Sequence, residues 1–428
     1  MERILPFRGL KYNKNIVGNL SSVLAPPYDV ISEETQKELL TGHPFNVIRL
    51  EYGQLIDTDT DIDNRYTRSK ETLTEWIYSG ILIQDRQPAV YVYGQEFGDE
   101  DGEKLVNKGV ICLVHLDDFE TGKIIPHEQI LLKAKSDRLK LLEKCQVNFS
   151  PVYALYEDEG QDADKIISGI MEYEPEISVK TADGMLQRLW SISDGDRVSG
   201  IISALKDKSL YIADGHQRYA AALEYRNMMR NINPEHTGNE LYNYVMMYLS
   251  DINDSGTRIL PMHRMVKNIV GFNENAVVSM LENIFTVEKV MTENVAVSAA
   301  KKLETSRDIP SFAMYTGKDY FYFLKLKNNE FTREVSGPDV TVLHKLVFGD
   351  VLDMSDSDIK NQTYLCYTED TKKAVNGVKD GNFQCSFMLN PVKIEEIKAI
   401  SAMQEKLPQK STYFYPKIKT GLVMNKLN

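Results

Sequence analysis

Residues 208–233 place a strand-like run directly before a helix-like run, with Asp214 and Gly215 at the junction. The run KSLYIAD has the aliphatic and aromatic content of a strand. The run HQRYAAALEYRNMMRNIN has the alanines and apolar period of a helix, and Pro234 follows its end. An all-helical or all-strand fold is therefore excluded for this part of the chain.

The same alternation of strand and helix patterns continues along the whole sequence. Strands are predicted at FNVIRLEYG, PAVYVYGQEF, NKGVICLVHLDDF, SPVYALYE and YVMMYLSD, with a hairpin at SFAMYTGKDYFYFLKLK. Helices are predicted at NRYTRSKETLTEWIYSG, at NENAVVSMLENIF, at VTVLHKLVFGDVL, around Leu139–Cys145 and over about 183–205. The pattern predicts an α+β, or mixed α/β, fold class.

The length of 428 residues exceeds what one compact core usually holds, so two or three domains are expected. We predict an N-terminal mixed α/β segment at 1–120, a core at 121–239 and a C-terminal mixed α/β domain at 240–428. The flanking segments are candidates for substrate selection or for making a homodimer.

Charge and composition exclude several classes of protein. A formal charge of −12 without a long basic run argues against a nucleic-acid partner. No apolar run approaches the roughly 20 residues that span a bilayer, and the N-terminus lacks a signal-peptide pattern. The four cysteines form no CxxC pair. We expect a soluble, cytoplasmic protein with no membrane partner.

The junction at Asp214 allows two interpretations, because the first N–H groups of a helix have no acceptors within the helix. Asp214 can cap the helix, with Gln217 three residues later completing a capping box. Alternatively, an anion such as a phosphate binds there, aided by His216 and Arg218, while Gly215 lets it approach the backbone. A carboxylate repels a phosphate, so the second interpretation requires a cation at Asp214, either Mg²⁺ or a substrate ammonium.

The segment IIPHEQ supplies a second set of candidate residues. His127 and Glu128 are suited to general-base chemistry, or else they are solvated residues of a turn. Arg138, further along, either pairs with Asp137 at the surface or points back to the same site.

Two further motifs leave their roles open. QKSTYFYPK, with Lys410 and Lys417, imitates the end of a phosphate-binding loop but lacks the glycines that such a loop needs. ILPMHRM carries His263 and Arg264, which are either structural or part of a site.

Several segments together resemble a bacterial and archaeal family catalogued as domain of unknown function 1015. They are FRGLKYN, APPYDVIS, IPHEQILLKAKSDRLKLL, NFSPVYALYE, IADGHQRYAAAL, ILPMHR and LPQKSTYFYPKIKTGLV, and they span almost the whole chain. This resemblance implies no activity.

Residues 122–228 also resemble, more distantly, the ParB and sulfiredoxin superfamily, and within it the free-serine kinases. The resemblance implies that Glu128 is the base for the substrate hydroxyl, with His127 beside it, and that Asp214 contacts a metal or the substrate. It implies that Gly215, His216 and Arg218 hold the phosphates, to which we add Arg138. Gln217 departs from the family, as does the single arginine at this turn.

The function implied by this resemblance is nucleotide binding by residues 121–239 and phosphoryl transfer from ATP or ADP, with Mg²⁺, to the hydroxyl of a small-molecule substrate, a free amino acid, with L-serine as the first candidate. Two alternatives remain open: a nucleotide-binding regulatory module of the ParB kind, and a phosphatase acting on phosphoserine.

Overall fold

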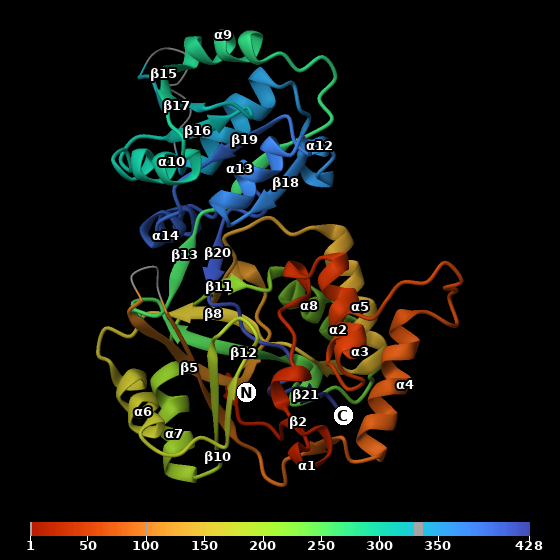
Figure 1. Cartoon of the computed structure of the whole chain (residues 1–428). Helices are drawn as coiled ribbons and strands as arrows, with labels where there is room; N and C mark the ends of the chain where they lie inside the picture. The colour runs from red at the N-terminus through yellow and green to blue at the C-terminus, as the bar shows by residue number, and fades with distance from the viewer. Residues whose placement is uncertain (1, 99–101, 329–336) are drawn as a thin grey trace. The chain divides into compact units, whose positions relative to one another are not determined.

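The structure is a computed structural model that describes residues 2–98, 102–328 and 337–428. The chain divides into two compact units (Figure 1). The first unit comprises Met1–Pro126, Ile130–Arg258 and Pro416–Asn428, and the second comprises His127–Gln129 and Ile259–Tyr415. Each unit is described by itself below.

This division differs from the three segments proposed from the sequence, with boundaries near 120 and 240. One sheet of the first unit takes strands from 1–120, from 121–239 and from the start of 240–428. The C-terminal residues also return to the first unit, although they are distant from it in sequence. Such long-range pairing has no signal in local composition.

The first unit is built on a mixed sheet that has nine strands within the described residues. In spatial order, its strands are β6 (Ile124–Ile125), β11 (Leu210–Asp214), β8 (Val152–Tyr156), β12 (Tyr244–Asp251), β5 (Lys104–His115), β4 (Val90–Gly98), β10 (Leu186–Ile192) and β9 (Ile177–Lys180), with β1 (Ile4–Leu5) beside β5. Strand β8 lies antiparallel to β11 and parallel to β12. Two small pairs accompany this sheet: β2 (Leu10–Tyr12) with β3 (Leu82–Gln84), and β7 (Val147–Asn148) with β21 (Asn425–Lys426).

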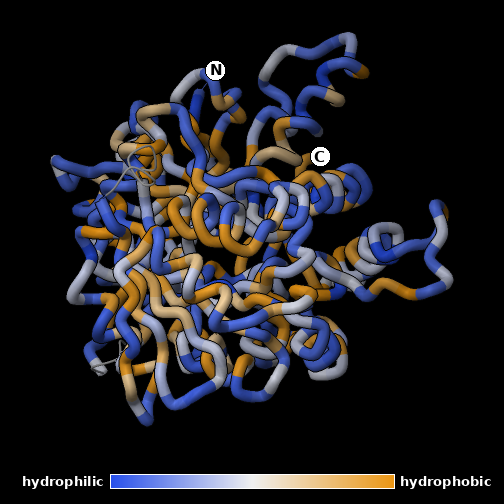
Figure 2. Tube along the Cα trace, turned by 90° about the horizontal axis from the view of Figure 1, so that it is seen from above, coloured by the Kyte–Doolittle hydropathy of each residue, from blue (hydrophilic) through white to orange (hydrophobic). Residues whose placement is uncertain are grey.

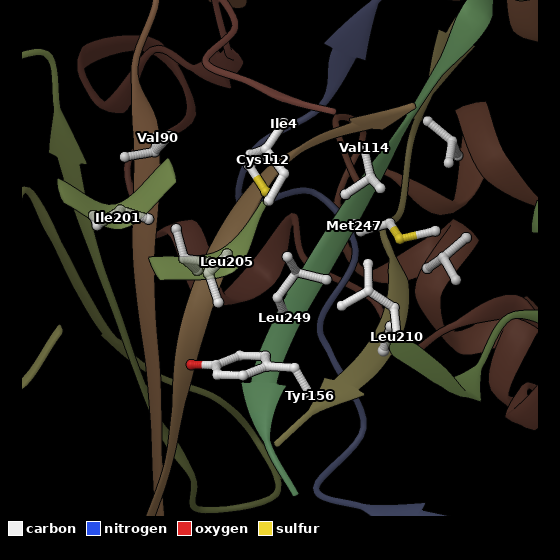
Figure 3. Packing of buried hydrophobic residues seen from close by; sticks show 14 of the residues in the cluster. Ile4, Val90, Cys112, Val114, Tyr156, Ile201, Leu205, Leu210, Met247 and Leu249 are labelled. Atoms are coloured by element: carbon white, nitrogen blue, oxygen red, sulfur yellow. The ribbon is translucent and has the colours of Figure 1, made fainter. Parts of the chain in front are cut away.

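The first unit has eight α-helices within the described residues, and the last four of them contribute side chains to the apolar cluster on one face of this sheet. They are α1 (Lys14–Val17), α2 (Glu33–Gly42), α3 (Ile48–Glu51), α4 (Arg65–Tyr78), α5 (Leu132–Cys145), α6 (Asp162–Met171), α7 (Gly195–Leu205) and α8 (His216–Ile232), with 3₁₀ turns at Leu20–Ser22, Tyr28–Val30, Phe119–Thr121 and Leu241–Asn243. Figure 3 shows Ile201 and Leu205 of α7 beside strand residues such as Cys112 and Leu249. Figure 2 shows hydrophilic residues at several of the protruding turns. Burial of this cluster fixes α6, α7 and α8 on the sheet.

The opposite face of the sheet is polar although it is buried. Tyr248 donates to Asn107 Oδ1 at 2.7 Å, and Asn107 Nδ2 donates to the Tyr153 hydroxyl at 3.2 Å. Tyr248 pairs across strands with Tyr153, and Tyr153 pairs with Asp214. Directly opposed residues of neighbouring strands share a face, so Asp214 emerges on this polar side.

The second unit has its own sheet and core. In spatial order, its strands are β15 (Phe285–Met291), β17 (Tyr320–Leu326), β16 (Ser311–Tyr315), β19 (Cys385–Met388), β14 (His263–Val266) and β18 (Leu365–Thr368), and β13 (Arg258–Leu260) pairs with β20 (Tyr413–Tyr415). Its helices are α9 (Glu274–Ile284), α10 (Val295–Glu304), α11 (Asp339–Val342), a π-helix (Leu343–Val351), α12 (Asp356–Asn361), α13 (Thr371–Lys379) and α14 (Ile394–Ala402). Side chains of α10 and α13 pack on this sheet.

The mixed α and β class predicted from the sequence is confirmed, as are most of the predicted elements. Two predictions are wrong. FNVIRLEYG forms the short helix α3 instead of a strand, because the Asn46 side chain accepts from Ile48 N and donates to two earlier carbonyls. Residues 183–205 are not one helix, because 186–192 pair with β4 as strand β10.

Candidate functional site

The junction between β11 and α8 adopts the geometry that an anion site needs. Gly215 is the N-cap of the 17-residue helix α8, with a φ of 91°, and as a glycine it offers no side chain to cap the helix. Asp214 therefore does not occupy the N-cap position, and the capping interpretation of DGHQ is wrong. The start of such a helix carries partial positive charge.

The carboxylate of Asp214 lies between two cations. Its Oδ2 is 2.6 Å from Nη2 of Arg218, one turn into α8, and its Oδ1 is 2.5 Å from Nζ of Lys417. These three side chains are only 10–13 % exposed. Because two positive groups share one negative group, the cluster carries a formal charge of +1.

Arg218 is anchored as well as paired. Its Nη1 donates to Ser150 Oγ at 3.0 Å and to the carbonyl of Pro151 at 2.6 Å. Burial lowers the pKa of Arg218, but neighbouring carboxylates, with Asp214 foremost, outweigh burial and raise it overall. The guanidinium is therefore a fixed, permanent positive charge at the start of α8.

A chain of contacts connects Arg218 to Arg138. Ser150 donates to Glu51 Oε1, and Arg138 Nη1 donates to the Glu51 carbonyl at 3.1 Å. The Arg138 guanidinium stacks on Tyr28 at 3.9 Å from the ring centroid, and its Nε donates to Asp137. Arg138 therefore does pair with Asp137, although the arginine is buried and not at the surface. It also lines the same cavity as Arg218.

A cavity of about 40 Å³ is lined by Glu51, Arg138, Ser150 and Arg218, together with apolar side chains. Such a volume suits one or two water molecules and is too small for a nucleotide. The cavity is therefore not itself a nucleotide pocket, and its lining residues lie around Arg218. His216, the first residue of α8, is buried at 7 % exposure.

His127 and Glu128 belong to the second unit, where they hold the segment Lys410–Thr412. Glu128 Oε1 accepts from Ser411 N at 3.0 Å, and from Thr412 N and Thr412 Oγ1 at 2.9 Å each. His127 Nε2 lies 2.8 Å from the same Thr412 hydroxyl, and the His127 side chain is buried. The motifs PHEQ and QKST are thus joined, and these residues are not solvated residues of a turn.

Arg264 and His263 are structural residues of the second unit. Arg264 is fully buried, donates to the carbonyls of Met262 and Lys410, and lies 5.4 Å from the Tyr367 ring centroid. Burial lowers its pKa to about 10. Burial also lowers the pKa of His263 to about 3, and Arg264 adds to this shift. Arg264 thus helps to hold the Lys410 backbone, whereas His263 Nε2 lies 2.9 Å from Thr371 Oγ1 and its Nδ1 accepts from Leu389 N.

The structure therefore brings Asp214, Gly215, Arg218 and Arg138 together in the first unit. Sequence reasoning missed Glu51, Ser150 and Tyr28, and it left Lys417 open. Ser150 precedes the predicted strand SPVYALYE and Tyr28 lies in APPYDVIS, so both stand in segments of the family resemblance. Glu51 carries no local signal of its role. Its burial depends on helix α3, which forms where the sequence predicted a strand.

The described residues contain neither a metal-binding cluster nor a helix that could span a membrane. No group of three or more His, Cys, Asp or Glu side chains there is arranged to hold a metal ion. None of the described helices has the length and apolar character that a membrane-spanning segment requires.

Comparison with known proteins identifies a family and some distant structures. Residues 4–347 match the family described as "Protein of unknown function (DUF1015)". No curated protein matches the chain.

The similar solved structures include a free serine kinase mutant in complex with AMP, at 14 % identity and a TM-score of 0.37, covering 73 % of this chain and 92 % of that one. A conserved hypothetical protein from Pyrococcus furiosus has 16 % identity and a TM-score of 0.36, covering 73 % and 95 %. SbnI from Staphylococcus aureus, truncated at its C-terminus, has 12 % identity and a TM-score of 0.37, covering 73 % and 85 %. Similarities this low do not by themselves establish an activity.

Proposed function

This chain belongs to the DUF1015 family, and since that family's description assigns no activity, we propose one from the site: a nucleotide-dependent phosphotransferase. The phosphoryl donor is ATP or ADP, and the acceptor is the hydroxyl of a small free amino acid, with L-serine as the first candidate. The observation that carries the proposal is the start of α8, where Gly215 is the N-cap and the preceding Asp214 pairs with both Arg218 and Lys417.

The β11–α8 junction suits a phosphate for three reasons. The N–H groups of a helix start point outward and carry partial positive charge. Arg218 supplies a fixed cation that does not deprotonate near neutral pH. Gly215 has no Cβ, which lets this guanidinium lie against the start of α8, since a Cβ there would come within 2.8 Å of Arg218 Nε. A nucleotide is the phosphate carrier that the similarity of DGHQR to the free-serine kinase motif favours.

Asp214 does not fit the role of a resident Mg²⁺ ligand in the arrangement observed. Both of its oxygens contact cations, which repel a divalent ion, and no metal-binding cluster occurs in the described residues. Mg²⁺ commonly reaches such sites coordinated by the phosphates of the nucleotide, so the protein need not hold it. Asp214 instead orients Arg218 and Lys417.

The resemblance to free-serine kinases also carries the proposal for the base. We propose that Glu128 accepts the hydroxyl proton as the substrate oxygen bonds to the terminal phosphorus. The bond from that phosphorus to the bridging oxygen breaks, and the shorter nucleotide leaves with this oxygen. The Thr412 hydroxyl holds Glu128 in position by donating to its Oε1, and His127 Nε2 in turn bonds to that hydroxyl.

Two variants distinguish whether Glu128 acts as the base or only anchors residues 410–412. Glu128→Gln keeps an oxygen that accepts from Ser411 N and Thr412 N, but it cannot take a proton. We expect its kcat to fall by about 10²- to 10⁴-fold while its nucleotide affinity and fold are kept. Turnover that survives in Glu128→Gln but is lost in Glu128→Ala would instead assign Glu128 a positioning role.

The proposed activity is tested by phosphorus NMR of the purified protein with Mg-ATP or Mg-ADP, with and without L-serine. Serine-dependent appearance of a phosphomonoester is the expected result. Arg218→Met should lose this activity, whereas Arg197→Met, at an exposed arginine of α7, should keep it.

Three other results would refute the proposed kinase. Tight nucleotide binding without turnover over a panel of amino acids would indicate a regulatory module. Phosphoserine hydrolysis without nucleotide would indicate a phosphatase. Absence of nucleotide binding would remove the premise of the site.

A further inference from the structure

The C-terminal segment, residues 416–428, runs along the first unit and is tied to it at many points. Thr420 and Ala25 exchange two backbone hydrogen bonds, of 2.9 and 3.2 Å, and Met424 and Leu10 exchange another two. Gly421 has a φ of 99°, and a Cβ there would lie 3.2 Å from Val47. The segment is therefore a fitted part of the first unit and not a loose tail.

Lys417 is held at the start of this segment by contacts on both sides. Its backbone carbonyl accepts from Gln95 Nε2 at 2.9 Å. Two residues later, Lys419 Nζ lies 2.5 Å from Asp183 Oδ2. These anchors fix the Lys417 backbone, and its ammonium reaches Asp214 Oδ1 at 2.5 Å with 11 % of the side chain exposed.

We infer that Lys417 is a phosphate-binding cation of the proposed site and that the C-terminal segment serves to place it there. Asp214 gives one oxygen to Arg218 and the other to Lys417, so the two cations are aligned on one carboxylate. A lysine ammonium has three N–H donors, and its bond to Asp214 uses one of them. The inference rests on the proposed function, because it names a ligand group of that same site.

This assignment solves the electrostatic problem that Asp214 poses. A phosphate next to a lone carboxylate is repelled, so a cation is required between them. Lys417 and Arg218 occupy both carboxylate oxygens and supply that charge from the protein itself. Nucleotide binding should consequently not depend on a metal ion at Asp214.

The test is isothermal titration with ADP and AMP in EDTA, on the full chain and its variants. We expect wild-type protein to bind ADP in EDTA, and Lys417→Met to raise the Kd by about 10- to 100-fold, as for loss of a charge-assisted hydrogen bond. Lys419→Met removes a lysine of the same segment that pairs with Asp183, and it should stay within about threefold of wild type. Lys417→Arg should recover part of the affinity.

Folding is checked by the fluorescence of Trp76 and Trp190, both in the first unit. If Lys417→Met unfolds, the double variant Asp214→Asn with Lys417→Met is used, because it removes the carboxylate charge together with the lysine. This double variant should fold and should bind ADP with the same loss of affinity, of about 10- to 100-fold. Wild-type affinity in either folded variant would overturn the inference while leaving the proposed function standing. Wild-type protein that binds no nucleotide, with or without Mg²⁺, would refute the proposed function and the inference with it.

Discussion

Replacing Gly215 by alanine should damage both the stability of the first unit and the site. The φ of 91° costs an L-residue with a Cβ about 1–2 kcal/mol. A Cβ would also lie 2.8 Å from Nε and 2.9 Å from Nη2 of Arg218, so the guanidinium must move. Moving it weakens the bonds to Ser150 and Pro151, which adds about 1–3 kcal/mol. We therefore expect the free energy of unfolding to fall by about 2–5 kcal/mol.

A matched control separates the two contributions. Gly80 follows α4 with a φ of 72°, and a Cβ there would meet nothing within 4 Å. Gly80→Ala should thus cost the backbone strain without a displaced neighbour. Both substitutions remove the same freedom from the unfolded chain, so this contribution cancels in the comparison.

The assay is urea unfolding followed by tryptophan fluorescence, which reports on the first unit because both tryptophans lie there. Gly215→Ala should unfold at a lower urea concentration than Gly80→Ala and should also lose affinity for ADP. Equal midpoints for the two variants would refute the argument, because they would show that Arg218 is not held against Gly215.

The remaining predictions concern a buried acid and a stacked arginine. Burial, with the charge of Glu396 adding to it, raises the pKa of Asp339 to about 7. The folded state therefore holds this proton more tightly than the unfolded state, and the second unit loses this stability as the pH rises from about 4 to about 7. Asp339→Asn should flatten that fall, as measured by circular dichroism at pH 5 and pH 8, and an unchanged pH profile would contradict the assignment. Arg138→Lys loses the planar contact with Tyr28, so the first unit should be destabilised by about 1–2 kcal/mol in the tryptophan assay; a shift below about 0.5 kcal/mol would show that the stacking contributes little.

Local structure was predictable where a strong period coincided with clear boundaries. The strand before Asp214 and the helix after Gly215 are examples, since alanines and a following proline mark the helix. Prediction failed at 45–53, where closely spaced apolar residues match a strand as well as a buried turn of helix. The Asn46 side chain decides for the helix by binding the carbonyls of Ser22 and Leu24, which no local pattern reveals.

The site was predictable only in the part that is local in sequence. Asp214 and Arg218 are four residues apart, so a helix start brings them together whatever the rest of the chain does. Glu51 and Ser150 reach Arg218 from elements that lie 68 or more residues away in sequence. Their arrival depends on sheet order, and one sequence does not specify sheet order through composition or periodicity.

Charge balance nevertheless predicted one long-range feature of the site that sequence periodicity could not, namely a cation next to Asp214. The carboxylate of Asp214 beside a helix start required a cation before any partner was known, because the phosphate and the carboxylate repel each other. The requirement left open whether a metal ion, a substrate ammonium or a side chain would meet it. Lys417 meets it from 203 residues away, through a C-terminal segment that the sheet and the first 50 residues hold in place. The charge that the sequence demands at Asp214 thus comes from the chain's own fold, which is why we expect a metal chelator to leave nucleotide binding intact and the loss of one lysine to abolish most of it.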